Sequence, residues 1–442
     1  GKHMILVCGP EEQRQLANMP ESILSARQAV ADIGFEQTLG NKNVHEGTNL
    51  HKSIVKGIWH CGNDGTTRTK DTTSADRQVQ TWLLAIQEAM QQEVCNDSQK
   101  TYELFHLLRR VMLRSTIQVM IGEAFLRDWN DYDFLGNFMD FQDTLEDVTA
   151  KAVVLPKCLA LVAMLWPLQR RRESLQQIIR KRLETILTPG MGTNNQTDKA
   201  KASPNDGDIG FWLREMLEKE NKNKYDLSDV AEFIVGLLFA AHKNPAIGAA
   251  QSFLFLKERA PTHVQVQCQT EANNLFSRPT WDQASGSSPT LKRVCLESLR
   301  LTAHSIGAVR TAQRNLTISV STPRPKTFQI PKGSSVGFAH IAASLDPNSW
   351  GDDSSAFDVE HRHSELYQDD YKFTVFSHGV HKCPGERLAV VMLQITIAAL
   401  LVKYNVCLPE TIPSLSFERA TLAQRDGPVT VLIERKVEEK EQ

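Results

Sequence analysis

The pattern of apolar and polar positions predicts a chain built mainly from helices. From about residue 103 to 125, apolar side chains recur three and four positions apart, as they do along one face of an α-helix. The same spacing predicts further helices near 79–94, 132–150, 170–187, 209–219, 228–257, 288–301 and 385–403. Runs typical of strands fall at 3–8, 307–320, 327–330, 334–339 and 428–434. We therefore expect a mainly α fold with small β-sheets, of the α+β class.

Two stretches without this periodicity predict exposed loops. Residues 188–208 are rich in Gly, Asn, Thr, Lys and Ser, and a second loop is expected over 271–288. No linker rich in Gly, Ser or Pro divides the chain into comparable parts, so we expect one large domain over residues 1–442.

Composition narrows the class of protein. The 442 residues include 50 Lys+Arg, 52 Asp+Glu and 41% apolar residues, which excludes disordered, collagen-like and disulfide-scaffold proteins. A net charge of −2 gives no reason to expect nucleic acid as a partner. The eight cysteines are scattered singly, which favours free thiols in a reducing compartment.

No apolar run is long enough to span a membrane. Residues 152–166 are interrupted by Pro156 and Lys157, and they fall short of the roughly 20 residues that a spanning helix needs. The basic clusters 170–172 and 180–182 follow this run, and they either contact an anionic membrane surface or form a solvated helix face. The chain opens directly on a strand-like run, so we expect that an N-terminal membrane anchor is absent from it.

The most specific pattern lies at residues 376–386, Phe-Ser-His-Gly-Val-His-Lys-Cys-Pro-Gly-Glu, which lead directly into an apolar helix. Its Phe, Gly, basic residue, Cys and Gly coincide by chance on the order of once in millions of positions. The segment resembles the cysteine-ligand loop of the cytochrome P450 family, the heme-thiolate monooxygenases. The resemblance implies a heme b cofactor with Cys383 as the ligand of the iron, because N–H groups and the dipole at a helix start stabilise a thiolate.

The other positions of this loop have roles by the same resemblance. Gly379 would allow a tight turn with positive φ, and Gly385 would let the helix pass the porphyrin without a Cβ clash. Phe376 would cover the sulfur from water. His381 stands where the family has Arg or His facing a heme propionate.

A second family element is the Glu-x-x-Arg pair at Glu297 and Arg300. At i and i+3 the two side chains share a helix face, and in the family they form a buried ion-pair network with a third basic residue. In the family, that third residue comes from a Phe-x-Pro-x-Arg segment. Residues 357–362 match this segment, with Val359 in place of the Pro. Either His361 or Arg362 can complete the network.

The family's long distal helix matches residues 228–257, and the run 236–241 looks closest to the sterol 14α-demethylase branch. Lys243 occupies the usual acid position, and Asn244 replaces the usual relay Thr. Pro245 has no N–H, so the helix should open at this turn, where protons would arrive through water or His242. The alternative is an exposed Asn-Pro helix end. We take His242, Lys243, Asn244 and Pro245 as the candidate catalytic residues.

Further positions follow from the resemblance alone. Heme contacts are expected from Arg310, His51 and Lys52, with surface charges as the alternative for each. Substrate contacts are expected from Phe233, Leu237, Ala241, Ser305, Ile306, Gly307, Ala308, Val309, Thr421 and Leu422.

These resemblances predict a monooxygenase that inserts one oxygen atom into a lipophilic substrate, a terpenoid, sterol or polyketide of fungal secondary metabolism. The implied partners are NADPH-cytochrome P450 reductase and cytochrome b5, at the cytosolic face of the endoplasmic reticulum membrane. Because Asn244 replaces the relay Thr, a redox-neutral isomerase or dehydratase, or a peroxide-using enzyme, is the alternative. A heme sensor or electron carrier is the minor one.

Overall fold

The computed structural model describes residues 4–46, 72–95, 100–127, 131–152, 155, 157–187, 226–280, 284, 289–320, 326–362, 364–419 and 421–436. The chain divides into two compact units, each made from separate stretches of sequence. Unit 1 comprises Gly1–Val30, Ala75–Met112 and Lys243–Gln442, and unit 2 comprises Ala31–Ser74 and Leu113–His242. The expected loop at 188–208 and helix at 209–219 lie outside the described residues.

Helix α20 (Glu386–Lys403) lies at the centre of unit 1. It packs against α14 (Lys243–Glu258), α15 (Thr262–Ser277) and α17 (Thr290–Leu301). Its side chains from Val390 to Leu401 are buried on every side, as expected for a helix without a polar face. The shorter helices of this unit are α1 (Pro10–Ala17), α18 (His340–Ser344), α19 (Pro347–Trp350) and the 3₁₀ turns η4 (Ser364–Gln368), η5 (Thr374–Phe376) and η6 (Gly379–His381).

The described strands all belong to unit 1. The four-stranded sheet has the order β1-β7-β4-β2, from Met4–Val7, Ser335–Phe338, Ala308–Ala312 and Leu24–Ser25. Only the β1–β7 pair in this sheet is parallel. A three-stranded sheet joins β3 (Thr101–Glu103), β11 (Thr430–Arg435) and β8 (Tyr404–Cys407). Two antiparallel pairs complete the strands: β5 (Leu316–Val320) with β6 (Lys326–Ile330), and β9 (Leu415–Ser416) with β10 (Gln424–Arg425). Val7, Leu16, Val336 and Phe338 form the core between the four-stranded sheet and α1.

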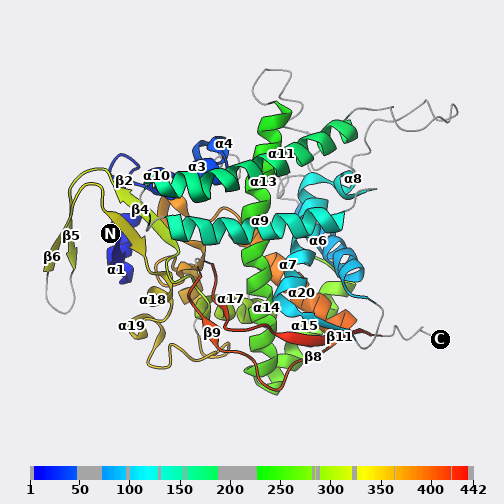
Figure 1. Cartoon of the computed structure of the whole chain (residues 1–442). Helices are drawn as coiled ribbons and strands as arrows, with labels where there is room; N and C mark the ends of the chain where they lie inside the picture. The colour runs from blue at the N-terminus through cyan, green and yellow to red at the C-terminus, as the bar shows by residue number, and fades with distance from the viewer. Residues whose placement is uncertain are drawn as a thin grey trace, which may run out of the picture. The chain divides into compact units, whose positions relative to one another are not determined.

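Unit 2 is helical in its described part. Helix α11 (Trp166–Leu187) packs against α9 (Asp131–Ala152) and α13 (Leu227–Ala241), and α9 and α11 run side by side in Figure 1. The shorter elements are α3 (Phe35–Thr38), α4 (Asn41–His45), α8 (Glu123–Leu126), α10 (Lys157–Ala160) and the π-helical turns η1 (Ile117–Ile121) and η2 (Leu161–Leu165). The boundary between the units falls inside α2 (Ala26–Asp32), α6 (Thr72–Glu93) and α7 (Leu104–Thr116).

The predicted fold class is confirmed, but several elements differ from the prediction. The helix expected over 103–125 is divided into α7, η1 and α8, and α1, α15 and β8 were not predicted. The strand run 307–320 is two strands, because the chain bends at residues 313–314 and changes its pairing partner, from β7 for β4 to β6 for β5. The loop expected from residue 271 is wrong up to Ser277, because Ala272 and Leu275 continue the buried face of α15. The helix 228–257 is divided into α13 and α14 at His242.

Contrary to the expectation from the sequence, one stretch of the described helices, Leu227–Glu258, is long and apolar enough to cross a membrane. Within its most apolar window, 72% is buried inside the protein. This degree of burial is typical of a core helix.

Candidate functional site

Cys383 lies in the loop between η6 and α20. Its backbone N–H donates to the carbonyl oxygen of Phe376 at 2.7 Å, and its side chain is exposed. The surrounding protein atoms raise the pKa of the thiol, and the N–H of Gly385 acts in the opposite direction. The sulfur stands at the start of an 18-residue helix, where unpaired N–H groups and the helix dipole favour an anionic ligand.

Two glycines shape this loop in different ways. Gly379 has φ +63°, and a Cβ at this position would lie 2.8 Å from the carbonyl oxygen of Ala17. Gly385 has free space instead, because a Cβ there would meet only the sulfur of Cys383, at 3.8 Å. The first glycine is therefore required by the turn, and the second leaves room for a ligand beside the sulfur.

Polar contacts hold the two residues that precede the cysteine. His381 Nε2 lies 3.1 Å from Oε1 of Glu21. Lys382 Nζ lies 2.6 Å from Asp370 and 2.9 Å from Glu386. In this structure His381 therefore contacts a carboxylate of the protein, and its expected contact with a heme carboxylate stays a prediction.

Arg310 of β4 is a buried cation. Its side chain donates to the carbonyl of the adjacent Val309 at 2.9 Å, and its Cζ lies 5.7 Å from the ring centroid of Phe338. No described carboxylate lies within ion-pair distance of the guanidinium. Burial lowers its pKa, and the more distant Glu21 acts in the opposite direction. A buried charge without a counter-charge is costly, so this position favours an anionic ligand.

These features fit the heme that the sequence implies. Heme offers iron for the exposed sulfur of Cys383, a flat macrocycle for the open space beside Gly385, and carboxylates for Arg310. The two other expected heme contacts, His51 and Lys52, lie outside the described residues.

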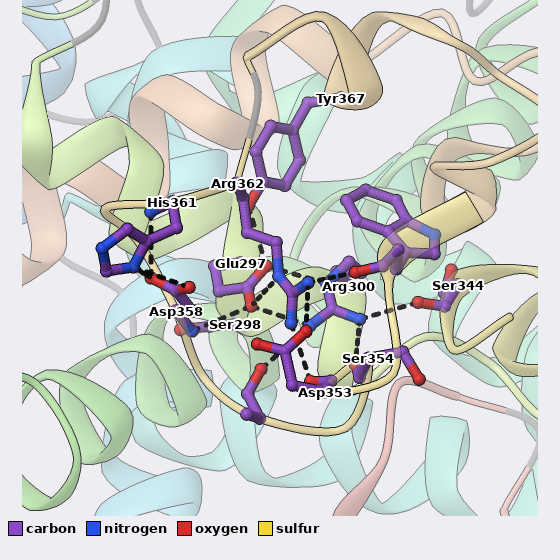
Figure 2. Close-up of polar contacts among 12 residues, drawn as sticks. Glu297, Ser298, Arg300, Ser344, Asp353, Ser354, Asp358, His361, Arg362 and Tyr367 are labelled. Atoms are coloured by element: carbon purple, nitrogen blue, oxygen red, sulfur yellow. Dashed lines mark hydrogen bonds and ion pairs between the residues drawn. The ribbon is translucent and has the colours of Figure 1, made fainter. Parts of the chain in front are cut away.

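The expected buried ion pair is present in α17 (Figure 2). Arg300 donates through Nε and Nη2 to both carboxylate oxygens of Glu297, at 2.8 and 2.7 Å, and both side chains are fully buried. Arg300 also donates to the carbonyl oxygens of Ser344 and Ser354, which ties α17 to the segment that leads to the cysteine loop. The pair therefore has its hydrogen bonds satisfied, which a buried ion pair requires.

The third member of this network is Arg362. Its Nε lies 3.7 Å from Glu297, and its Nη1 lies 3.0 Å from Asp353. His361 points away in Figure 2, is 84% exposed and contacts Asp358 instead. Tyr367, which the sequence pattern did not single out, donates to Glu297 at 2.7 Å, and burial together with this carboxylate raises its pKa.

The distal helix opens at His242, as expected. Pro245 is the third residue of α14, a position whose N–H has no partner within a helix, so proline is tolerated there. His242 is fully buried, and its Nδ1 lies 2.6 Å from the carbonyl oxygen of Leu238, which makes Nδ1 the protonated nitrogen. Lys243 is also buried.

Asn244 contacts one of the expected substrate positions. The N–H of Leu422 donates to Asn244 Oδ1 at 3.4 Å. This contact orients the amide oxygen toward Leu422, so the NH₂ group of Asn244 remains as a donor. The structure thus brings Asn244 and residues 421–422 together, although they are separated by almost 180 positions.

The remaining predicted substrate contacts differ in exposure. Residues 305–309 are half-buried, where α17 leads into β4. In α13, Phe233 and Leu237 are buried, whereas Ala241 is half-buried. Their contact with a substrate stays a prediction.

Sequence reasoning missed three neighbouring histidines, His304, His340 and His378. A lone histidine carries little signal, and these three lie on segments that meet only in the folded protein. The position of His378 inside the cysteine loop was the one available indication.

Comparison with known proteins gives a consistent result. The family model described as "Cytochrome P450" matches residues 69–433. The chain is 23% identical to cytochrome P450 monooxygenase 71 of Postia placenta, over 92% of this chain and 79% of the relative. It is 21% identical to cytochrome P450 monooxygenase tenB of Beauveria bassiana, over 70% of this chain and 61% of that protein.

Solved structures show the same fold. The crystal structure of the cytochrome P450DA heme domain superimposes with a TM-score of 0.66, at 15% identity, over 98% of this chain and 88% of the other.

Proposed function

We propose, from the premise that the chain belongs to the cytochrome P450 family, that this heme-thiolate monooxygenase acts on a lipophilic terpenoid, sterol or polyketide. The observation that carries the heme-thiolate part of this proposal is the exposed sulfur of Cys383, at a helix start and beside open space at Gly385. The substrate class is proposed from the likeness to the family. Heme bound there would supply the chemistry of dioxygen activation.

The protein's own residues have distinct tasks in this proposal. Cys383 holds the iron as a thiolate, and the start of α20 stabilises its charge. Arg310 and His381 hold heme carboxylates, and the Glu297, Arg300 and Arg362 network fixes the segment before the cysteine loop. Asn244 offers an NH₂ donor on the distal side.

The proposed partners and location follow from the family. Electrons come from NADPH-cytochrome P450 reductase, with cytochrome b5 as a second donor, at the cytosolic face of the endoplasmic reticulum membrane. Relatives from Postia placenta and Beauveria bassiana support a fungal protein, and a role in secondary metabolism is part of the proposal. Residues 1–442 act as one catalytic domain, and the likeness to sterol 14α-demethylases stays a prediction.

The carbon monoxide difference spectrum of the reduced holoprotein tests the role of Cys383. We expect an absorption band at about 450 nm, the signature of a thiolate ligand. Cys383→Ser and Cys383→His should lose it, whereas Cys407→Ser, at another exposed cysteine, should keep it. A thiolate band retained in either Cys383 variant would show that the ligand is elsewhere.

A redox-neutral or peroxide-using enzyme is the second candidate, and the side chain at position 244 favours it. An amide can donate and accept hydrogen bonds, but it does not pass a proton as a hydroxyl does. Because Oδ1 is directed to Leu422, the NH₂ group of Asn244 would bind an acceptor oxygen in the pocket. The relatives named as monooxygenases give no support to a sensor or electron carrier.

Variants of Asn244 distinguish the two candidates. In a monooxygenase, Asn244→Thr should keep or improve the coupling of NADPH use to product, and Asn244→Leu should release mainly hydrogen peroxide. In a redox-neutral enzyme, product should form without NADPH or reductase, and Asn244→Leu should lower its rate by about 10²-fold. An Asn244→Leu variant unchanged in both assays would remove Asn244 from the reaction site.

A further inference from the structure

Three histidines of unit 1 form a cluster that the proposed function does not use. The ring centroids of His304 and His340 lie 6.3 Å apart, and those of His340 and His378 lie 5.4 Å apart. His304 follows α17, His340 begins α18, and His378 belongs to the cysteine loop. The cluster therefore connects the expected substrate segment at 305–309 with the loop that carries Cys383.

His340 differs from its two neighbours because both of its ring nitrogens are buried without a partner among the described residues, whereas His304 and His378 each have one such nitrogen, Nδ1. Its side chain is 1% exposed, and neither ring nitrogen has a hydrogen-bond partner among the described residues. Nδ1 lies almost where Gly307 would carry a Cβ, so this nitrogen is pressed against the glycine. Nε2 is therefore the nitrogen that does not face Gly307, and it is buried as well.

The ring of His340 is neutral. Burial lowers its pKa well below the ordinary value, and His304, His378 and Arg310 act in the same direction. A neutral imidazole carries one N–H, and with Nδ1 enclosed by Gly307 the proton belongs on Nε2. A buried N–H without an acceptor is costly, so this group indicates an acceptor that binds here.

Nε2 of His378 cannot accept the N–H of His340, because it already bonds to Gln13. Gln13 donates through its amide to the carbonyl oxygens of Val7 and Ala339, so its Oε1 is left to accept from His378 Nε2 at 2.9 Å. His378 is thus held in place by the protein alone, whereas His340 is not.

Arg310 belongs to the same cluster. Its Cζ lies 5.7 Å from the Phe338 ring, and that ring lies 5.2 Å from His378. Its charge also lowers the pKa of both His340 and His378. A buried cation without a described counter-charge and a buried neutral donor without an acceptor thus lie close together, and a carboxylate has two oxygens that can satisfy both.

We propose that His340 donates its Nε2–H to the heme carboxylate that Arg310 neutralises, as an uncharged second donor. This inference rests on the proposed placement of Arg310 against heme. An uncharged donor suits the position of His340, because the charges of Arg310 and one heme carboxylate already balance. A second buried cation would have no counter-charge. A carboxylate of the substrate has the same chemistry, and the experiment separates the two sources.

Resonance Raman spectra of the ferric holoprotein without substrate test the contact through the propionate-bending bands. We expect these bands to shift in His340→Phe, which keeps an aromatic ring but has no donor, and to return toward wild type in His340→Gln. Heme transfer to an excess of a heme-scavenging globin should become about ten-fold faster in His340→Phe, in line with the loss of a hydrogen bond to a charged group. His263→Leu, at an exposed histidine, should match wild type in both measurements.

Gly307 provides an independent test of the same geometry. Gly307→Ala would place a methyl group where Nδ1 of His340 lies, so it should move the ring and shift the bands as His340→Phe does. In a His340→Ala background the same change should have little further effect, because its only expected action is on that ring. Equal effects of Gly307→Ala in both backgrounds would contradict the proposal.

The outcomes separate the inference from the proposed placement of heme. If Arg310→Gln shifts the bands and His340→Phe leaves bands and transfer rate at wild-type values, the inference alone is wrong. If neither variant has an effect, the heme carboxylate does not lie at Arg310, and the placement itself fails. Wild-type bands together with weaker binding of a carboxylate-bearing substrate in His340→Phe would assign the site to the substrate. If His340→Phe does not yield holoprotein, the comparison of Gly307→Ala in the wild-type and His340→Ala backgrounds tests the proposal instead.

Discussion

His378 is fully buried and neutral, and this makes the stability of the protein sensitive to acid. Burial, together with the charge of Arg310, lowers the pKa of His378 to about 4 from an ordinary value of 6.5. Between these two values the unfolded chain binds a proton at this residue and the folded protein does not. The free energy of unfolding must therefore fall as the pH falls from 6.5 to 4.

We expect His378 to contribute about 3 kcal/mol to this loss, from about 1.4 kcal/mol for each pH unit. Urea unfolding at several pH values should show a shallower acid dependence in His378→Leu than in wild type. His263→Leu, at an exposed position, should follow wild type. Identical slopes for His378→Leu and wild type would mean that His378 binds a proton in the folded protein.

The two basic residues that the sequence left open should differ sharply when each is removed. Arg362 is buried and contacts Glu297 and Asp353, so Arg362→Ala should cost about 3 kcal/mol and lower the yield of heme-loaded protein. His361→Ala should stay within about 0.5 kcal/mol of wild type, because its ring is exposed. Thermal unfolding of the two holoproteins measures the difference, and equal losses would contradict the geometry.

Sequence alone could not choose between these two neighbours. The spacing of the family pattern favours position 361, but the segment before it contains Val359 in place of proline. Val359 is buried and Asp358 donates its N–H to Glu297 at 3.1 Å, so the chain approaches the carboxylate through its backbone. Arg362 then reaches it with its side chain.

At the scale of elements, an exposed apolar face runs from α10 through η2 into α11. Leu159, Val162 and Trp166 are 52%, 56% and 47% exposed, and their spacing places them on one side of the helical path. Of the basic cluster that follows, Arg172 pairs with Glu232 at 3.4 Å and Arg171 pairs with Asp140, whereas Arg170 is exposed. The expected contact with a membrane surface therefore depends more on the apolar face than on three arginines.

Binding to liposomes that contain anionic lipids tests this face. The double variant Val162→Asp, Trp166→Asp should bind at least about ten-fold more weakly than wild type, because each side chain loses about 1.5–3 kcal/mol of apolar burial in the lipid. Val266→Asp, at a valine that is 60% exposed on α15, should bind as wild type does. Flotation assays measure the partitioning, and equal binding of all three proteins would exclude this face.

Periodicity predicted most of the long helices well because their buried faces are continuous. It failed where the chain changes its pairing partner, as between β4 and β5, and where tertiary packing extends an element, as at Ala272 and Leu275 in α15. The cysteine loop was visible because its residues are adjacent in sequence. The histidine cluster was not, since α17, α18 and the cysteine loop meet only after folding.

At the scale of the whole molecule, the chain passes between the two units four times, at residues 30–31, 74–75, 112–113 and 242–243. At three of these crossings it continues within a helix, α2, α6 or α7. Disruption of a shared helix removes packing from both units, so we expect them to unfold together as one domain.

Hydrogen exchange in increasing denaturant tests this cooperativity. Amides of α20 in unit 1 and of α11 in unit 2 should lose protection at the same denaturant concentration. Two separate midpoints would show that the units are independent domains.

The cysteine loop is completed by the beginning of the chain. Ala17 limits the turn at Gly379, Glu21 pairs with His381, and Gln13 bonds to His378 across 365 positions. At about 5–20 residues per second, a ribosome needs roughly 20–70 s to make the intervening chain. During that interval the first helix has no cysteine loop to contact, so we expect stable heme insertion only when synthesis is nearly finished.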